Sequence, residues 1–419
     1  MARMSSSVVV LVALVSLASP QCISDNDKLS LPLTPDLEHI TPFSLDLLKK
    51  FNPPTAKGNF FFSPYSIWNA LVLAYFGSAG QTRQQLQNVL RLSGPSNTLA
   101  TYKALERLYE ERQLNTSEYV IDLANKIYVS KRLALRDCIR DVLPKEVENV
   151  DFTQAIQAAA TINKFVNEKT RGKISNLVTP EDVKKVQMVL VNAAYFKGLW
   201  QKAFKPTNTL KEAFYPTPDK NIPVDMMRQT DNFKIGDSEE LRATVLEMPY
   251  KGDAASMFVM LPFKAAKGSV ETPLDTMLQR LNVDTFNAVV NKLRINEVIV
   301  RIPKFKLEHI ITDELTEALE HLGIKDLFSN DADLSNYDPE GKLKVSKAIH
   351  KAIVEVSEEG TEAAAATAFI GVSIVSIQKP PRPRVFICDR PFVFVIVDNV
   401  TNNILFMGIF RQPVNATRR

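Results

Sequence analysis

Residues 357–392 read SEEGTEAAAATAFIGVSIVSIQKPPRPRVFICDRPF, and this stretch interrupts a chain of otherwise regular strands and helices. The preceding residues 352–356 alternate with the period of a half-buried strand. The alanines at 363–366 are too small to anchor a core. The prolines within 379–384 exclude a central strand, because proline lacks the backbone N–H donor. We therefore expect an exposed segment, which is either a surface loop with a helix-prone start or a bait held out to another protein.

The composition is that of a globular protein. The chain has 419 residues, of which 45% are hydrophobic and 23% charged, and a net charge of +4. It contains no low-complexity linker and no repeat of fixed period, so one large domain is expected. The mildly basic balance does not by itself indicate nucleic acid or another polyanion as partner.

The N-terminus has the pattern of a secretory signal peptide. An apolar run at 8–17 follows a single early charge, and small residues at 16 and 18 suit cleavage. We predict a signal peptide over 1–18 and a mature domain over 19–419. The apolar run is too short to span a membrane, so the mature protein is expected to be secreted and extracellular. Three triplets are candidate N-glycosylation sites: Asn115, Asn399 and Asn415.

Only three cysteines are present, Cys22, Cys138 and Cys388. Stability must therefore come from the core, despite the oxidising destination. The odd number leaves at least one free thiol if Cys22 survives signal cleavage. The sequence alone assigns no disulfide.

Hydrophobic periodicity predicts an α+β architecture with large antiparallel sheets. Helices are expected over 37–51, from Ser63-Pro64 to about 77–80, and over 81–92, 98–114, 152–172, 273–281 and 313–322. Strands are expected over 59–62, 119–130, 185–196, 244–250, 255–261, 295–306, 392–397 and 404–410. In the helix over 152–172, the residues predicted to face inward are Ile156, Ile162, Phe165 and Val166. The apolar run at 185–196 predicts a central strand buried on both faces.

Nothing in the sequence indicates catalysis. The four histidines, His39, His309, His321 and His350, lie far apart and show no metal-ligand spacing. The nucleophile-elbow, dinucleotide and phosphate-loop motifs are all missing from the sequence. We expect neither an enzyme nor a cofactor or metal.

Eight segments in order resemble the serpin family, and the resemblance covers essentially the whole chain after the signal peptide. The segments begin at Asn59 (NFFFSPYSI), Thr161 (TINKFVNEKTRGKISNLV), Val189 (VLVNAAYFKGLW), Leu246 (LEMPY), Ile302 (IPKFKLE), Leu322 (LGIKDLF), Val345 (VSKAIHKAIVEVSEEGTEAAAAT) and Phe386 (FICDRPFVFVI). The resemblance implies three β-sheets, about nine helices and an exposed reactive loop that can enter the main sheet as an extra strand. A serine protease would then attack the loop over about 358–385 and be trapped as an acyl-enzyme.

By the same resemblance, the start of the loop is the hinge that enters the sheet. The hinge residues are Glu358, Glu359, Gly360, Thr361, Glu362, Ala363, Ala364, Ala365, Ala366 and Thr367. If Thr361 is the first to face the core, period 2 turns only uncharged residues inward and Glu362 outward. An inward charge would cost several kcal/mol, about enough to block insertion. The hinge therefore favours an inhibitor over the alternative, a non-inhibitory serpin that acts as a carrier or storage protein.

Spacing like that of inhibitory serpins puts the reactive bond between Ile374 and Val375. An aliphatic residue at this position favours a protease with an apolar pocket, such as an elastase-like enzyme. The far side of the loop carries Lys379, Arg382 and Arg384, which leaves a trypsin-like target open. Lys379 and Arg382 precede proline, and Arg384 lies beyond the spacing that insertion needs.

Four polar residues resemble the family's shutter beneath the main sheet: Ser63, Ser66, Asn192 and His350. Buried polar groups there must be hydrogen-bonded, and a network with two arrangements could let the strands part. A fixed network that only satisfies the hydrogen bonds of these buried groups explains the same residues equally well.

Arg132, Arg136 and Arg140 recur at four-residue spacing, so a helix there would carry a basic stripe. Such a stripe could bind a glycosaminoglycan, as in some serpins, but a solvated helix face is favoured. The expected partner is a serine protease, and the protein itself is expected to be a monomer without nucleic-acid or membrane contacts.

Overall fold

The computed structural model describes residues 22–23, 40–54, 56–115, 119–264, 272–341, 343–359 and 382–413. Within these ranges the α-helices are α1 (Ile40–Phe51), α2 (Pro64–Gly77), α3 (Gly80–Leu90), α4 (Pro95–Asn115), α5 (Asp137–Val142), α6 (Ala155–Lys169), α7 (Pro273–Arg280), α8 (Val283–Lys292) and α9 (Asp313–Leu322). The strands are β1 (Phe60–Phe62), β2 (Tyr119–Ser130), β3 (Val147–Val150), β4 (Met188–Gly198), β5 (Leu210–Thr217), β6 (Lys220–Ser238), β7 (Ala243–Pro249), β8 (Ala255–Pro262), β9 (Arg294–Pro303), β10 (Phe305–Ile311), β11 (Lys347–Val356), β12 (Arg384–Ile387), β13 (Phe392–Asp398) and β14 (Asn403–Phe410). The α+β class is confirmed.

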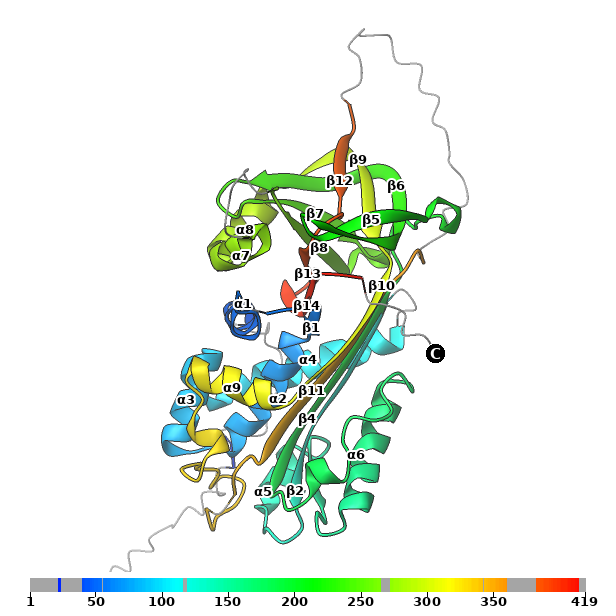
Figure 1. The fold of residues 1–419 in the computed structure, drawn as a ribbon. Coiled ribbons are helices and arrows are strands. Elements are labelled where there is room, and N and C mark those ends of the chain that lie inside the picture. Colours follow the sequence, from blue (N-terminus) through cyan, green and yellow to red (C-terminus); the bar gives the residue numbers. More distant parts are fainter. Residues whose placement is uncertain are drawn as a thin grey trace, which may run out of the picture.

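A five-stranded sheet with the order β10-β11-β4-β2-β3 forms the long axis of the molecule (Figure 1). β4 is its central strand, as predicted, and its residues 188–196 are all buried. α6 covers one face of this sheet, whereas α2 and α9 lie on the other (Figure 1). Ile162 and Val166 of α6 share a buried cluster with Val191 and Ile353 of the sheet. The centre of the sheet, at β4 and β11, is therefore covered on both faces.

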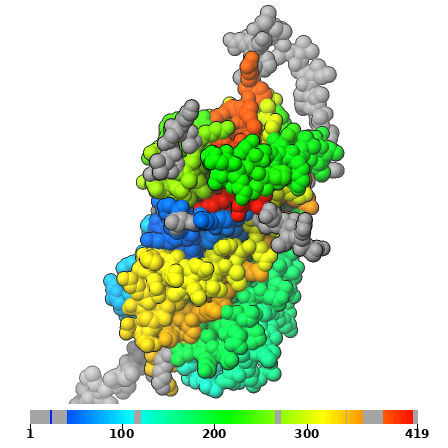
Figure 2. Space-filling model, viewed as in Figure 1, coloured from blue at the N-terminus to red at the C-terminus, as the bar shows by residue number. Residues whose placement is uncertain are grey.

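The other strands form a nine-stranded path with the order β1-β14-β13-β8-β7-β6-β9-β12, and β5 adds to β6. The family resemblance implied three separate sheets. In this structure two of them are joined into one, because β6 is 19 residues long and pairs with β5 through its first part and with β7 through its last part. Figure 2 shows the C-terminal strands, in red, between the green upper sheet and the blue and yellow lower helices.

Helix α2 begins as its sequence predicts. Ser63 is the N-cap, and its side chain accepts a hydrogen bond from the backbone N–H of Ser66, while Pro64 occupies the first turn. Every residue of α2 is buried. This helix therefore belongs to the core, where it packs against β2, β4 and β14.

Three expectations about side-chain direction and strand limits are wrong. Ile156 is 76% exposed, because it lies six residues before buried Ile162 and so about 120° away round the helix. The predicted strand over 295–306 is two strands, divided at Lys304, whose N–H bonds to Asp225 outside both. β11 is not half-buried, since Ile353 on its second face is covered beneath α6.

Cys22 and Cys138 form a disulfide that the sequence alone did not assign. Its two cysteines are 116 residues apart, and it ties the segment before α1 to helix α5. Cys388 is a free, buried thiol. None of the helices in the described ranges is long and apolar enough to cross a bilayer.

Candidate functional site

The site is the boundary between β4 and β11, which we call the seam. The two strands pair in parallel from Val189↔Lys347 to Lys197↔Glu355. Their outer neighbours, β2 and β10, are antiparallel to them. A strand that ran between β4 and β11 in the opposite direction would be antiparallel to both. The seam is therefore the one position in the centre of this sheet where an added strand would replace a parallel pair by two antiparallel pairs.

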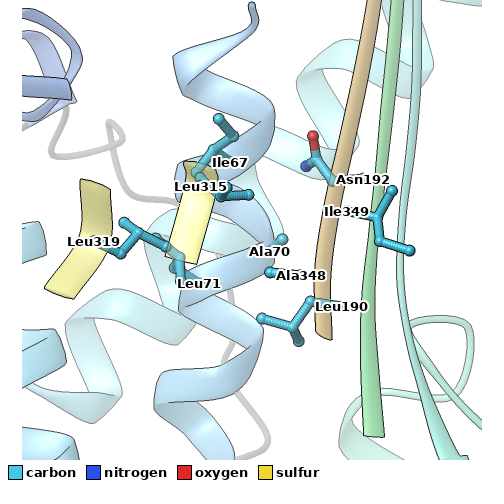
Figure 3. Close-up of a pocket in the computed structure, with 9 residues that line it drawn as sticks. All are labelled: Ile67, Ala70, Leu71, Leu190, Asn192, Leu315, Leu319, Ala348 and Ile349. Atoms are coloured by element: carbon cyan, nitrogen blue, oxygen red, sulfur yellow. The ribbon is translucent and has the colours of Figure 1, made fainter. Parts of the chain in front are cut away.

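Small side chains line the seam on the side of α2. Ala352 lies opposite Ala194, and Ala348 lies opposite Leu190. Beside them is a small cavity between α2, α9 and the two strands (Figure 3). The lining residues are Ile67, Ala70, Leu71, Leu190, Asn192, Leu315, Leu319, Ala348 and Ile349. Because almost all of them are apolar, the cavity offers water few partners and weakens packing beneath the seam.

The four predicted shutter residues come together under the seam, joined by Asn125 of β2. We call this set the seam cluster: Ser63, Ser66, Asn125, Asn192 and His350. Asn192 and His350 are opposite each other across the seam, and Asn125 is opposite Asn192 on the next strand. Three neighbouring strands thus each contribute one polar side chain at the same level.

Hydrogen bonds connect the whole seam cluster. The Ser63 N–H donates to Nε2 of His350 at 3.0 Å, and its hydroxyl donates to the Leu405 carbonyl at 2.7 Å. Ser66 Oγ donates to Oδ1 of Asn125 at 2.8 Å. The amide of Asn192 donates to Asn125 Oδ1 at 2.7 Å and also to the Ser66 carbonyl. The cluster ties helix α2 to both strands of the seam.

His350 is neutral in this network. Its Nε2 accepts from a backbone N–H, so the proton sits on Nδ1, which donates to Oδ1 of Asn192. Complete burial, with a smaller contribution from nearby His309, lowers the pKa of His350 to about 3. A protonated imidazole carries a hydrogen on both ring nitrogens, so it could not accept the hydrogen bond from the Ser63 N–H.

Sequence reasoning missed Asn125. Asn125 is one of several polar residues in β2, with Asp122 and Lys126, and only the strand register reveals that it lies beside Asn192. The sequence therefore gave no signal that singled out Asn125 or indicated its partner.

The hinge begins where β11 ends, and both described hinge residues are held there. Glu358, 9% exposed, accepts from Lys304 Nζ at 2.7 Å and from Thr209 Oγ1 at 2.9 Å. Glu359 pairs with Lys197 of β4 at 2.6 Å. Burial alone would raise the pKa of Glu358, but the bonds from Lys304 and Thr209 outweigh it and hold the pKa below its usual value.

Backbone N–H groups of Trp200 and Phe204 also bind the hinge. The N–H of Trp200 donates to the Glu359 carbonyl at 3.1 Å, and the Phe204 N–H donates to the Glu358 carbonyl at 3.1 Å. The indole of Trp200 donates to the Ser357 carbonyl at 2.8 Å and stacks on Tyr250. The chain therefore leaves β11 beside the end of β4, at the opening of the seam.

The rest of the predicted loop, Gly360–Thr367 with Ile374, Val375 and Lys379, lies outside the described residues. Arg382 is exposed, and Arg384 begins β12 and pairs with Asp237 at 2.8 Å.

The signal peptide over 1–18 and Asn415 are also outside the described ranges, as is the side chain of Asn115. The amide of Asn399 donates to the Asp253 carbonyl and to Ser256 Oγ, both at 2.9 Å, so a glycan there would replace two hydrogen bonds.

The helix that would align the three arginines does not form across them. Arg132 lies in a turn, Arg136 is the N-cap of α5, and only Arg140 is inside that six-residue helix. Arg140 donates to Asn149 at 3.3 Å. The prediction of a basic stripe on one helix is therefore wrong. Residues 131–136 lead from β2 into α5, which is too short to carry all three arginines.

We expect acid to weaken the fold through His350. Its folded pKa lies below the unfolded value of about 6.5, so its contribution to stability is complete above that pH and is lost as the pH falls towards about 3. Between pH 7 and pH 5 the loss should be about 2 kcal/mol. Urea unfolding of the wild type, His350→Gln and the exposed control His321→Gln at both pH values would measure it. An equal pH dependence in wild type and His350→Gln would contradict the assignment.

Glu358→Gln should weaken the attachment of the hinge. The variant loses the charge that meets Lys304, and we expect the free energy of unfolding to fall by about 1 kcal/mol, since Lys304 is itself half-exposed. The matched control Glu359→Gln removes a more exposed ion pair and should change stability by less than about 0.5 kcal/mol. Urea unfolding at pH 7 checks the difference, and equal effects would show that Glu358 is not specially held.

Comparisons with known proteins agree with this architecture. The family described as serpin (serine protease inhibitor) matches residues 38–413. Ipis-1 from Ixodes persulcatus is 36% identical over 383 residues, covering 89% of this chain and 98% of its own, and the leukocyte elastase inhibitor of Sus scrofa is 35% identical with the same coverage. The crystal structure of uncleaved ovalbumin is similar with a TM-score of 0.77 at 29% identity, covering 90% of this chain and 99% of its own. The family match and these relatives show that the chain belongs to the serpin family, which is described as a family of serine protease inhibitors.

Proposed function

We propose that this protein is a secreted serine protease inhibitor that acts as a suicide substrate. The observation that carries the proposal is the seam: a parallel pair in the centre of a sheet, with the hinge leaving β11 at its opening. A protease cleaves the loop, the freed loop enters the seam as an antiparallel strand, and the attached acyl-enzyme is carried along. Distortion of the protease then leaves the ester unhydrolysed.

Insertion can be driven by the strand pairing itself. About ten inserted residues that each gain backbone hydrogen bonds of roughly 0.5–1.5 kcal/mol would outweigh the lost freedom of the loop. The sequence suits this, because Thr361, Ala363, Ala365 and Thr367 would turn towards α2. On that side the seam offers Ala194 and Ala348 and the small cavity, which leave room for small side chains.

We further propose an elastase-like target that cleaves between Ile374 and Val375. The aliphatic Ile374 suits an apolar pocket, and a relative named leukocyte elastase inhibitor is 35% identical. A trypsin-like enzyme is the alternative target, through the basic residues on the far side of the loop. We do not propose polyanion activation, since Arg132, Arg136 and Arg140 share no helix.

The disulfide supports secretion. A bond between Cys22 and Cys138 forms and persists in an oxidising compartment, and cleavage after residue 18 leaves Cys22 in the mature chain. The full chain expressed in insect cells should appear in the medium, with a mature N-terminus at Ser19. Sequencing of the secreted protein, with a variant lacking residues 2–18 as control, checks this. Retention of the full chain in the cell with Met1 intact would overturn the proposal.

The central experiment is complex formation with a panel of elastase-, chymotrypsin-, trypsin- and subtilisin-like enzymes. We expect a complex that survives SDS, and a released C-terminal fragment that begins at Val375. Electrophoresis and mass spectrometry give both results. A fragment that begins elsewhere would refute the reactive bond, and cleavage by every enzyme without any covalent complex would refute the mechanism.

Thr361→Arg provides the matched variant for this experiment. The new charge would face the core after insertion at a cost of several kcal/mol, so the variant should be cleaved as a substrate at unchanged thermal stability. Glu362→Arg, at a position that faces water, is the control and should still inhibit. If Thr361→Arg trapped protease at full stoichiometry, the insertion step would be wrong.

The alternative function is a non-inhibitory serpin that carries or stores a ligand, in which the loop never inserts. Heat resistance separates the two: loop cleavage should raise the unfolding temperature sharply only if the loop enters the seam. The uncharged inward positions of the hinge favour the inhibitor.

A further inference from the structure

A short turn follows helix α6 and closes its C-terminal end. We call residues 170–174 the α6 turn. The Thr170 hydroxyl donates to the Val166 carbonyl at 2.7 Å, and its Oγ1 accepts from the Ile174 N–H at 3.0 Å. The turn is therefore a defined unit, which presents Arg171 and Lys173 from a fixed backbone.

Two electrostatic contacts hold the α6 turn on the five-stranded sheet. Arg171 forms an ion pair with Asp122 of β2, with 3.2 Å between Nε and Oδ1. The ammonium group of Lys173 lies 5.6 Å from the centre of the Tyr195 ring on β4. Asp122 and Tyr195 are opposite each other in the sheet, and Tyr195 is opposite Ile353 across the seam. The turn is therefore held near the end of β11, beside the opening of the seam.

Asp122 is poorly placed to carry a negative charge. Its side chain is 2% exposed, whereas that of Arg171 is 53% exposed. Neither Oδ2 of Asp122 nor the Tyr195 hydroxyl has a hydrogen-bond partner among the described residues. Burial of a carboxylate with one unpartnered oxygen favours the neutral form. It raises the pKa of Asp122 to about 6, although Arg171 and Lys173 act to lower it.

Tyr195, on the neighbouring strand, stays protonated when Asp122 titrates. Burial raises the pKa of Tyr195 to about 12, with smaller contributions from Glu355, Asp122 and Glu359. The two cations of the α6 turn keep their charge throughout the acid range. The proton that binds at this site near pH 6 therefore binds to Asp122.

The segment that follows the α6 turn is attached to β11 by a contact that mild acid leaves intact. Asp182 accepts from Lys347 Nζ at 2.6 Å and from the Thr179 hydroxyl at 2.7 Å. Burial alone would raise the pKa of Asp182, but the bonds from Lys347 and Thr179 outweigh it and hold the pKa below its usual value. At pH 5.5 Asp182 is therefore still charged, whereas Asp122 is mostly neutral.

We propose that Asp122 and Arg171 form an acid-sensitive catch, which holds the α6 turn on the sheet at neutral pH and releases it in mild acid. The contact of Asp182 with Lys347 keeps the following segment in place, so that release is confined to the turn. This inference goes beyond the proposed inhibitory function and does not depend on it, because the catch operates in the free protein. Its consequence is that the cover beside the opening of the seam becomes mobile as the pH falls.

Local release and overall stability should respond to the protonation of Asp122 with opposite signs. The folded pKa lies above the unfolded value of about 3.9, so proton uptake by this group stabilises the fold. This contribution is complete below about pH 3.9 and is lost as the pH rises through about 6. The same proton removes the charge that Arg171 meets. The α6 turn should therefore loosen while Asp122 itself causes no loss of overall stability.

Hydrogen exchange read by mass spectrometry tests the catch. The backbone N–H groups of residues 170–173 all donate to carbonyl oxygens within residues 166–170, so their exchange reports release of the turn. Between pH 7.5 and pH 5.5 their protection, corrected for the intrinsic exchange rate at each pH, should fall about fivefold in the wild type. Asp122→Asn should show the low protection at both pH values. At pH 7.5 this variant should unfold at a urea concentration equal to or higher than that of the wild type.

Glu148→Gln is the matched control. Glu148 pairs with Lys126 at 3.0 Å, and the ammonium group of Lys126 lies 4.4 Å from the centre of the Phe165 ring of α6. The variant thus weakens a neighbouring attachment of the same helix without touching the catch, and it should keep the pH response of the wild type. Arg171→Gln removes the other half of the catch and should match Asp122→Asn in its exchange.

Constant protection of the α6 turn between pH 7.5 and pH 5.5 in the wild type would overturn the proposal. A wild-type pH response in Asp122→Asn would also overturn it, since another group would then be the sensor. Loss of the response in Glu148→Gln would do the same, because any weakened contact of α6 would then explain the release. The wild-type measurement needs no substitution, so a variant that fails to fold leaves the test intact.

Discussion

The parallel pairing of β4 with β11 is the constraint on which the other features depend. Parallel strands need a long connection, and here 148 residues separate Gly198 from Lys347. The two strands are therefore held together by what lies above and below them more than by their sequence proximity. α6 covers one side, α2 and the seam cluster the other, and the hinge contacts close one end.

Polar groups are used differently at the two places where they meet the seam. Beneath it, His350 and Asn192 are buried and neutral, and they specify which strands lie side by side. At its opening, Glu358 and Glu359 make ion pairs that water can reach. The buried network sets the register of the closed sheet, whereas the ion pairs at its edge are weak enough to exchange.

The sequence predicted most of the fold, because long apolar periods carry their own signal. The central strand β4, the capped start of α2 and helix α9 are where the periodicity placed them. β5 and β6 were not predicted, because the exposed, polar residues 210–238 show no strong alternation of apolar and polar side chains. The prediction for Ile156 failed because its spacing of six residues from Ile162 places it on another face of the helix, whereas the arginine stripe failed because residues 131–136 form no helix. Asn125 and the Cys22–Cys138 bond depend on long-range register, which no local pattern contains.

Cys388 is a natural reporter of motion at the top of the molecule. It follows β12, its N–H bonds to the Arg301 carbonyl of β9, and its side chain is fully buried. Burial raises the pKa of this thiol far above its usual value and shields it from solvent, so it should react slowly while β12 stays paired with β9. Labelling by a thiol reagent therefore follows the detachment of this short strand, and at high reagent concentration its rate reports how fast that edge opens.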